Sequence, residues 1–484
     1  MMRCSCRDER GSVSDALDDI RTVLITAIHV GLAVWVTAHV LLHKRDTSAA
    51  VGWIGIAWLS PIVGSLLYFV LGINRVRRRA GRLGKHRPGH GRPRPPPRPP
   101  GRDDHLAPLE RAVQHITGRP AEAGNEVLPL HDGDEAYPAM LAAIDAARHS
   151  VALSTYIFRG DAAGRLFVDA LARATRRGVA VKVLVDGVGG GYFTSPACRA
   201  LRRAGVDVGR FLHSPLPWRM PFLNLRTHRK ILVADGRVGF VGGLNIGGEN
   251  MLAAGPRHPV RDIHFRLRGP AVAQLAEVFA DDWLFMAGEQ LGGSAWFPPL
   301  GAAGDVVART ITSGPDQDYG KTELVILQAI ACARRCIKIM TPYFLPDEDT
   351  ITALALAATR GVDVDIVVPA RTNHRVVDWA FGAHVGPLLS AGVRIWRSPP
   401  PFNHSKVMTV DGLWCLLGSA NWDLRSFRLN FEINLEVYGS TLVQKIDEAL
   451  MGERSDPLTG PELIHRTPPR RLRDAAARLL LPYI

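Results

Sequence analysis

The stretch RTHRKILVAD, residues 226–235, combines a strand-like apolar run with three polar residues at fixed spacing. His228 and Lys230 are two residues apart, and Asp235 follows five residues after the lysine. Alternate residues of a β-strand point to the same face, so the imidazole and the ammonium are expected to project together. One such pattern arises often by chance, and its significance depends on whether it recurs.

The pattern recurs in the C-terminal half of the chain. The stretch NHSKVMTVD, residues 403–411, carries a second histidine, lysine and aspartate at identical offsets, which are His404, Lys406 and Asp411. A glycine and an asparagine then follow each histidine by 14 and 17 residues, namely Gly242 and Asn245 in the first copy and Gly418 and Asn421 in the second. Five residue types at five matching offsets indicate a duplication.

The duplication extends to the surrounding segments. SVALSTYIF (150–158) resembles CIKIMTPYF (336–344), and GVAVKVLVDG (178–187) resembles GVDVDIVVPA (361–370), in the same order along the chain. Apolar strand-like runs alternate with alanine-rich helical segments, which predicts an α/β fold with a mixed or parallel sheet. We therefore expect two tandem α/β domains related by pseudo-twofold symmetry, at residues 105–300 and 301–484.

Two long apolar runs precede these domains. Residues 22–42 and 49–73 contain no Asp, Glu, Lys or Arg, and each is long enough to cross a hydrocarbon core of about 30 Å as a helix. They predict a transmembrane helical hairpin over residues 22–73, after an N-terminal tail at 1–21. Arginines flank the outer ends of both runs more densely than the turn between them, which places both ends and the α/β domains in the cytoplasm.

The positive charge of the chain is concentrated in one segment. The formal net charge is +13, and residues 75–102 alone contain eleven Arg or Lys and no acidic residue. Residues 74–104 are also rich in proline, so they predict an extended basic linker, either close to anionic headgroups or solvated and without a specific partner. A charge this local, without interleaved aromatic residues, argues against nucleic acid as a partner. The sequence leaves a homo-oligomer open.

Two imidazoles and two ammonium groups in one cleft would suit phosphoryl transfer. One histidine would attack phosphorus, and the other would protonate the leaving oxygen and then deprotonate the incoming nucleophile. Lysines and nearby polar groups would hold the non-bridging oxygens, and the candidates for phosphate contacts are Asn245, Asn421 and Ser419. No metal or other cofactor is expected, because a lysine stands where a metal site requires a histidine or a carboxylate.

Four carboxylates are candidates for supporting roles. A carboxylate that accepts from the second ring nitrogen would fix the tautomer of each histidine, and Asp262 and Glu432 are candidates for this role. Asp235 and Asp411 belong to the motif and are counted with the catalytic residues. Each precedes a glycine, however, and a turn-stabilising role through side-chain-to-backbone hydrogen bonds is the preferred interpretation.

The paired His-x-Lys-x4-Asp-x6-Gly-x2-Asn pattern resembles that of the phospholipase D superfamily. Further stretches, such as TPYFLPDE, GSANWDLRSFRLNFEINLEVY and the second apolar run, resemble the bacterial cardiolipin synthases. The resemblance implies a membrane phosphatidyltransferase that moves a phosphatidyl group from one phosphatidylglycerol through a phosphohistidine to a second, releasing glycerol. It also implies anionic phospholipid partners, and it pairs His228, Lys230 and Asn245 with their second-copy counterparts, with His228 favoured as the nucleophile.

Three other functions remain open at this point. A phospholipase D-type hydrolase or a head-group transphosphatidylase for other phospholipids would use the same residues. A nuclease of the same superfamily is opposed by the membrane hairpin. A non-enzymatic membrane scaffold is opposed by the presence of every expected catalytic residue.

Overall fold

The computed structural model describes residues 9–43, 47–69, 105–213 and 225–479. The predicted basic linker lies outside these ranges, as does the start of the predicted N-terminal tail. The chain divides into two compact units, residues 1–79 and 80–484.

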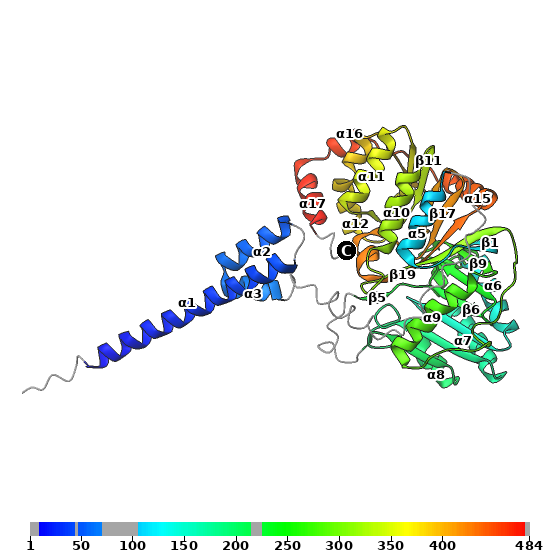
Figure 1. Cartoon of the computed structure of the whole chain (residues 1–484), viewed down its shortest axis with the longest axis horizontal. Coiled ribbons are helices and arrows are strands. Elements are labelled where there is room, and N and C mark those ends of the chain that lie inside the picture. Colours follow the sequence, from blue (N-terminus) through cyan, green and yellow to red (C-terminus); the bar gives the residue numbers. More distant parts are fainter. Residues whose placement is uncertain (1–8, 44–46, 70–104, 214–224, 480–484) are drawn as a thin grey trace, which may run out of the picture. The chain divides into compact units, whose positions relative to one another are not determined.

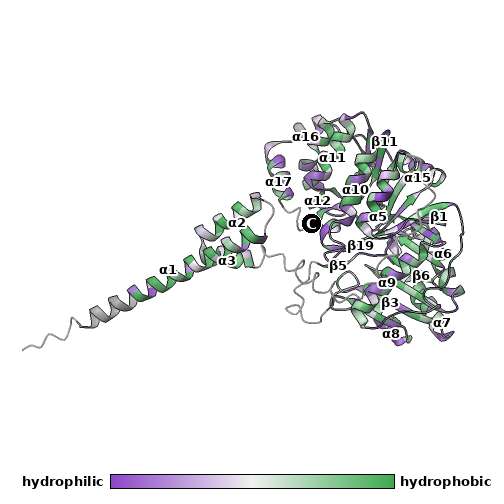
Figure 2. Ribbon diagram, in the orientation of Figure 1, coloured by the Kyte–Doolittle hydropathy of each residue, from purple (hydrophilic) through white to green (hydrophobic). Residues whose placement is uncertain are grey.

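The first unit is helical and apolar. Its helices are α1 (Glu9–His43), α2 (Thr47–Leu59) and α3 (Pro61–Leu67). Within α1, the segment Asp19–His43 is long and apolar enough to cross a membrane. Most of this segment and of α2 is coloured as hydrophobic in Figure 2. The outward-facing apolar side chains of these helices suit a lipid environment, so the unit is suggestive of a membrane anchor.

The second predicted span is interrupted. Ser60 leaves the helical region, with φ −143° and ψ 76°, and α3 begins at Pro61. Proline has no N–H for the helical ladder and its ring clashes with the preceding turn, which explains the break. The part of residues 49–73 that the structure describes is therefore two short helices, and α2 is a short apolar helix of 13 residues. A hydrogen bond between His39 Nδ1 and the Tyr68 hydroxyl, at 2.7 Å, ties α1 to the end of this segment.

The second unit is an α/β structure in two similar halves (Figure 1). The strands of the first half are β1 (Glu122–His131), β2 (Ser150–Thr155), β3 (Ala180–Asp186), β4 (Asp207–Phe211), β5 (Arg226–Thr227), β6 (Ile231–Ala234), β7 (Val238–Gly242), β8 (Val260–Arg261) and β9 (Ile263–Arg268). Its helices are α6 (Asp132–Ala146), α7 (Ala162–Arg176), α8 (Pro196–Arg203), η3 (Gly248–Asn250), η4 (Leu252–Ala254) and α9 (Val272–Ala287). The helix α5 (Ala107–Thr117) precedes them in the chain but packs into the core of the second half.

The second half repeats the order. Its strands are β10 (Val306–Ser313), β11 (Cys336–Met340), β12 (Phe344–Leu345), β13 (Asp363–Pro369), β14 (Arg394–Ser398), β15 (Phe402–Asn403), β16 (Val407–Val410), β17 (Trp414–Gly418), β18 (Trp422–Asp423) and β19 (Asn430–Tyr438). Its helices are α10 (Lys321–Cys332), α11 (Glu348–Thr359), α12 (Arg375–His384), α13 (Gly386–Ser390), α14 (Leu424–Arg428), α15 (Ser440–Gly452), α16 (Gly460–Ile464) and α17 (Pro468–Arg478).

One mixed sheet runs through both halves. Its order is β14-β13-β11-β16-β17-β19-β10-β1-β9-β7-β6-β2-β3-β4, and β5 also pairs with β19. Reading outward from the β10–β1 pair, each side has the same succession of strands. The outer three strands of each side are parallel, and the inner ones are antiparallel. This arrangement is the pseudo-twofold relation that the duplicated sequence predicts.

The centre of the sheet joins the halves through a shared apolar core and a buried ion pair. A single hydrophobic cluster includes Leu267 of β9, Ala308 of β10 and Leu435 of β19. Arg309 faces Glu436 across the β10–β19 ladder, with Nε 2.7 Å from the carboxylate, and both side chains are fully buried. The continuous ladder and shared core imply that the two halves form one folding unit.

Candidate active site

Each motif histidine lies directly after a short strand that pairs with the other half. Arg226 and Thr227 of β5 pair with Asn430 and Phe431 of β19, and the His228 amide donates to the Phe431 carbonyl at 2.9 Å. In the mirrored contact, β15 pairs with β8, and the His404 amide donates to the Arg261 carbonyl at 2.7 Å. These reciprocal contacts bring both histidines to the junction of the halves.

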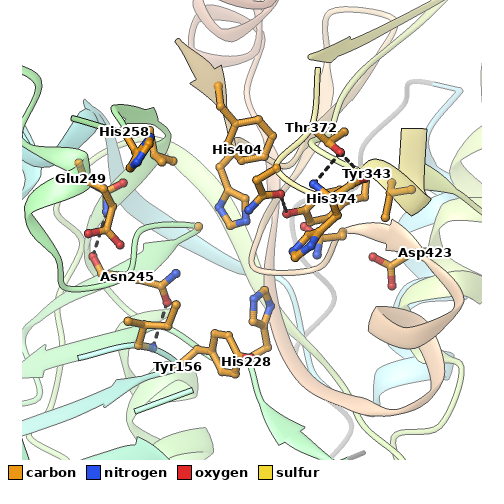
Figure 3. Close-up of a pocket in the computed structure, with 18 of the residues that line it drawn as sticks. Tyr156, His228, Asn245, Glu249, His258, Tyr343, Thr372, His374, His404 and Asp423 are labelled. Atoms are coloured by element: carbon orange, nitrogen blue, oxygen red, sulfur yellow. Dashed lines mark hydrogen bonds between the residues drawn. The ribbon is translucent and has the colours of Figure 1, made fainter. Parts of the chain in front are cut away.

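The two imidazoles point into the same space, as Figure 3 shows. They line a cleft of about 1180 Å³, together with Asn245 and Asn421. A volume of this order is typical of a site that encloses a small-molecule ligand. The structure thus brings together four of the residues that the sequence singles out, two from each half.

The tautomer of His228 is set by a carboxylate from the second half. Its Nδ1 lies 2.9 Å from Glu432 Oε2 and 3.1 Å from the Ser419 carbonyl. The Ser419 carbonyl can only accept. Burial opposes ionisation of Glu432, but His228 and Lys230 lower its pKa below the usual value, so its carboxylate is an acceptor as well. Nδ1 therefore carries the proton, and Nε2 keeps its lone pair.

His404 is oriented in the same way by a carboxylate from the first half. Its Nδ1 is 2.9 Å from Asp262 Oδ2 and 2.7 Å from the Lys406 nitrogen. One tautomer cannot make both hydrogen bonds, and the ionised carboxylate selects the Nδ1–H form. Burial opposes ionisation of Asp262, but Lys406 and His404 lower its pKa below the usual value. Each half therefore supplies the orienting acid for the other half's histidine.

Burial favours the neutral form of both imidazoles. Burial lowers the pKa of His228, with Lys230 and Lys406 adding to the effect against the opposing charge of Glu432. Burial, followed by the nearby Lys406, lowers the pKa of His404 to about 3. The lysine of the opposite half contributes to the lowered pKa of each ring, as expected when the two motifs share one electrostatic environment.

The two lysines lie buried beneath the histidines and are not part of the cleft lining. Lys230 Nζ donates to the His228 carbonyl at 2.8 Å, and Lys406 Nζ donates to the His404 carbonyl. Burial, partly offset by the charges of Glu432 and Asp262, lowers the pKa of Lys230 to about 7 and that of Lys406 to about 8. Two neighbouring buried ammonium groups create a positive potential that favours an anion in the cleft.

The predicted phosphate contacts differ in position, because Asn245 and Asn421 line the cleft and Ser419 does not. Asn245 accepts from the Ile157 amide at 3.2 Å through Oδ1, which turns its amide nitrogen toward the cleft. The side chain of Ser419 is fully buried and does not line the cleft, and its hydroxyl donates to Glu432 Oε2 at 2.5 Å. This position favours a role for Ser419 in holding Glu432 in place, instead of the predicted contact with the phosphate.

Asp235 and Asp411 lie in the turns at the far ends of the motif strands. Asp235 accepts from the backbone amides of residues 148–150, and Asp411 accepts from those of residues 334–336. Both adopt positive φ angles, 51° and 56°, and neither lines the cleft. This geometry matches the turn-stabilising interpretation, with each aspartate fixing the start of a parallel strand.

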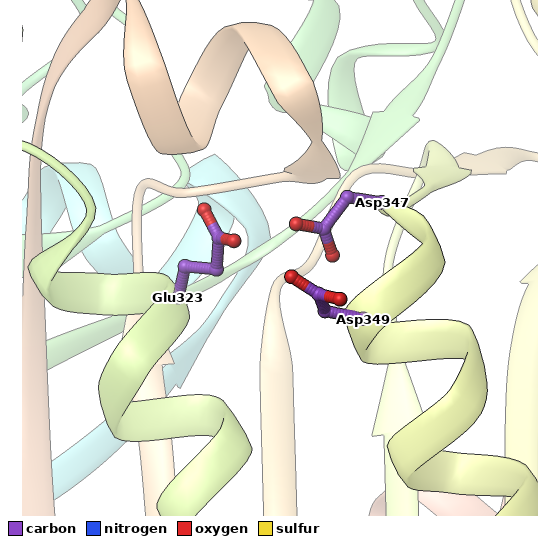
Figure 4. A group of neighbouring side chains, drawn as sticks. All are labelled: Glu323, Asp347 and Asp349. Carbon is purple, nitrogen blue, oxygen red and sulfur yellow. The ribbon is translucent and has the colours of Figure 1, made fainter. Parts of the chain in front are cut away.

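A cluster of acidic groups lies outside the cleft lining. The carboxylates of Glu323, Asp347 and Asp349 lie close together at the ends of α10 and α11 (Figure 4), with ligand atoms within 4.8 Å of one another. Arg428 contacts Glu323 at 3.5 Å and Asp347 at 3.0 Å. Burial and the adjacent Asp347 raise the pKa of Glu323 to about 7. The Arg428 guanidinium and a proton shared between Glu323 and Asp347 thus offset the repulsion among the carboxylates, which would otherwise favour a bound cation.

Arg229, which lies between the motif histidine and lysine, was not singled out by the sequence. Its side chain points away from the cleft and binds both oxygens of Asp282 on α9, at 2.6 and 2.7 Å. The alternation predicted for this stretch was the available signal, because it turns residue 229 away from its neighbours. In the structure, residues 228–230 connect β5 and β6 and are not themselves part of a strand. The cleft-lining residues Arg226, Arg425 and Asp423 were likewise not singled out.

The duplicated fold and the paired motif in one cleft define a phospholipase D-like protein. The family model described as "Cardiolipin synthase, PLD-like domain" matches residues 140–283 and 326–452, and "Phospholipase_D-nuclease N-terminal" matches residues 31–72. The chain belongs to the cardiolipin synthase family of phospholipase D-like proteins.

Relatives match along nearly the whole chain. A cardiolipin synthase of Geobacillus kaustophilus is 33% identical over 93% of this chain and 92% of its own length. The major cardiolipin synthase of Bacillus subtilis is 31% identical over 97% of this chain and all of its own length. Among solved structures, phosphatidylserine synthase of Haemophilus influenzae has a TM-score of 0.60 at 17% identity, covering 78% of this chain and all of its own, a likeness of fold.

Proposed function

We propose that the protein is a cardiolipin synthase that transfers a phosphatidyl group between two phosphatidylglycerol molecules and releases glycerol. The observation that carries the proposal is the reciprocal orientation of two histidines in one cleft. Each ring has its Nδ1–H held by a buried carboxylate, Glu432 for His228 and Asp262 for His404. The Nε2 lone pairs are therefore available for attack on phosphorus and for proton transfer.

In the first step, His228 Nε2 attacks the phosphorus of the donor phosphatidylglycerol. A P–N bond forms and the P–O bond to glycerol breaks, while His404 gives the leaving oxygen a proton. A phosphodiester anion bound between the histidines raises the pKa of His404 and allows it to carry that proton. Glu432 stabilises the positive charge that develops on His228.

In the second step, the free hydroxyl of the acceptor head group attacks the phosphohistidine. His404 takes the hydroxyl proton, a P–O bond forms and the P–N bond breaks. Cardiolipin leaves, and both rings return to their starting states. Lys230 and Lys406 supply positive charge beneath the phosphate, while Asn245 and Asn421 donate to its non-bridging oxygens.

We propose the following organisation for the chain. Residues 22–73 form a two-span membrane hairpin, in which the α2–α3 segment crosses with a break at Pro61, a break that neighbouring groups can satisfy. The tail at 1–21, the linker at 74–104 and the two catalytic domains, 105–300 and 301–484, are cytoplasmic. The basic linker keeps the catalytic unit near phosphatidylglycerol and other anionic lipids.

Lipid products provide the direct test of this function. Purified full-length protein is incubated with phosphatidylglycerol vesicles, with and without phosphatidylethanolamine, and the products are identified by mass spectrometry. We expect cardiolipin and glycerol in equal amounts. Phosphatidic acid as the only product would show a hydrolase and would refute the proposal.

Replacement of Glu432 by glutamine is expected to lower kcat by about 10²–10⁴-fold. The amide keeps the size of the side chain but removes the charge that stabilises a positive His228. Steady-state kinetics should show a much smaller change in KM, together with an altered pH profile. As a matched comparison, Ser419→Ala leaves the charge of Glu432 in place and removes the hydrogen bonds of the hydroxyl to Glu432 and to the Ile433 backbone. It should cost about tenfold. Equal effects of the two changes would contradict the charge-based role.

The pH dependence of kcat/KM should follow the two buried lysines. Each must carry its proton to attract the phosphodiester, so activity is retained below the pKa and lost as pH rises through it. With the pKa of Lys230 at about 7 and that of Lys406 at about 8, we expect the basic limb between about pH 7 and 8.

Substitution of Lys230 by arginine tests this assignment. Arginine stays protonated throughout this range, so any remaining activity should lose less as pH rises. Lys182→Arg is the control, because Lys182 pairs with Asp207 and Glu289 and does not line the cleft. An unchanged basic limb in the Lys230 variant, or a shifted one in the control, would contradict the assignment.

A further inference from the structure

The two walls of the cleft differ although the motifs that they flank are alike. Two residues before His228 stands Arg226, whereas Phe402 occupies the same offset before His404. Four residues after Asn421 stands Arg425, whereas Glu249 occupies that offset after Asn245. All four side chains line the cleft. The divergence therefore lies at two matched positions and makes one wall basic.

The two arginines of the basic wall belong to the same local structure. Arg226 lies in β5, which pairs with the first residues of β19, and Arg425 lies in α14, which ends just before β19. Arg226 is the strongest charged neighbour that lowers the pKa of Arg425, after burial itself. Tyr156, which contacts the His228 ring at a centroid distance of 5.1 Å, is within the electrostatic influence of both guanidinium groups.

Carboxylates face this pair but have backbone partners of their own. Asp186 accepts from the amides of residues 188, 189 and 227. Asp423 accepts from the Ser426 amide at 2.7 Å, and although burial raises its pKa to about 6, it is mostly ionised near neutral pH. Of these carboxylates only Asp423 lines the cleft, so two guanidinium groups face one carboxylate there. An anion between the two guanidinium groups would relieve their repulsion.

The opposite wall differs from this basic wall. Glu249 is paired with Arg159, with its carboxylate 2.8 Å from Nε. Phe402 packs near the His404 ring at a centroid distance of 5.9 Å. The further arginines of the cleft, Arg257, Arg371 and Arg375, are exposed at its rim. An anion that enters deeply beside the histidines therefore finds its half-buried cationic partners on the His228 side.

We propose that Arg226 and Arg425 form a second phosphodiester subsite, which holds the phosphate of the acceptor lipid while the donor phosphate lies between the histidines. The proposal rests on the proposed function. Cardiolipin carries two phosphodiesters joined by one glycerol, so a synthase must hold two anions at the moment of transfer. A hydrolase, whose acceptor is water, needs only one. Guanidinium groups suit this role because they bind phosphate oxygens in a bidentate manner.

Two reactions of the same phosphohistidine separate the subsites. Cardiolipin formation requires an acceptor that carries a phosphate, whereas exchange of labelled glycerol into phosphatidylglycerol requires only the donor phosphate. In phosphatidylglycerol vesicles, Arg226→Gln and Arg425→Gln should each lower the ratio of cardiolipin formation to glycerol exchange by about 10–100-fold, the range for losing charge-assisted hydrogen bonds. Arg425→Lys, which keeps the charge, should recover part of the ratio.

The control is Arg176→Gln, an exposed change on α7 outside the cleft, which should leave the ratio unchanged. A proportional fall of both reactions in the Arg226 and Arg425 variants would overturn the subsite, because the pair would then serve the donor or the fold. An unchanged ratio with unchanged rates would also overturn it. Glycerol exchange without any cardiolipin from the wild-type protein would refute the proposed function itself, and the acceptor subsite with it.

Discussion

Replacing either His228 or His404 by alanine is expected to lower cardiolipin formation by about 10⁴-fold or more. The two rings act in sequence on one phosphorus atom, and residues that act as a unit each cost nearly the whole rate enhancement when removed. Both rings lie in the same cleft, and each is oriented by a buried carboxylate. Product formation from phosphatidylglycerol vesicles measures the loss, and the double variant should be little worse than either single one.

A donor with an activated leaving group distinguishes the two histidines. A phosphatidyl ester of p-nitrophenol needs no acid to release its alcohol, so the His404→Ala variant should still form a phosphohistidine at residue 228. The His228→Ala variant should form none. Mass spectrometry of the protein locates the adduct. An adduct on His404 in the His228 variant would exchange the proposed roles of the two rings.

Replacement of Asp282 by alanine is expected to lower the free energy of unfolding of the catalytic unit by about 3–5 kcal/mol. The change leaves the Arg229 guanidinium without its bidentate partner, at a site where the two side chains are 1% and 2% exposed. An uncompensated buried charge is costly, and the loss is a large share of a typical domain stability of about 5–15 kcal/mol. Denaturant unfolding of the full-length protein in detergent provides the measurement.

Two comparisons make this result specific. Asp145→Ala breaks the exposed pair with Arg173, whose side chains are 42% and 46% exposed, and it should cost less than about 1 kcal/mol. The double change Arg229→Met with Asp282→Leu removes both charges and should be less destabilising than Asp282→Ala alone. If Asp282→Ala cost no more than Asp145→Ala, the buried pair would have no special part in stability.

Offsets along the chain were sufficient to predict much of the fold. The repeat of His228 and Lys230 at His404 and Lys406 indicated two α/β halves, because five residue types recur there at five matching offsets. The matching strand orders on the two sides of the sheet agree with that prediction. The interruption of the second span at Pro61 was not part of the prediction, because the length of an apolar run gives no measure of how continuous its helix is.

The partners within the site were harder to predict. Asp262 and Glu432 could be predicted as orienting carboxylates because each follows a motif asparagine. That each one orients the histidine of the other half depends on β5 pairing with β19 and β15 pairing with β8. Such two-residue strands are too short to leave a periodic pattern in the sequence. Ser419 was expected at the phosphate, and its burial behind Glu432 follows from the same long-range pairing.

The reciprocal exchange of carboxylates has a consequence for how such a protein can diversify. Contacts in which each half gives the other what it receives are those of an isologous dimer, in which one surface meets its own copy. Two identical chains meeting in this way would form the same pair of oriented rings, but with identical surroundings on both sides. Covalent fusion removes that constraint, so equivalent positions can carry different residues, such as Arg226 and Phe402. A site with symmetric catalytic groups can then distinguish the donor lipid from the acceptor lipid.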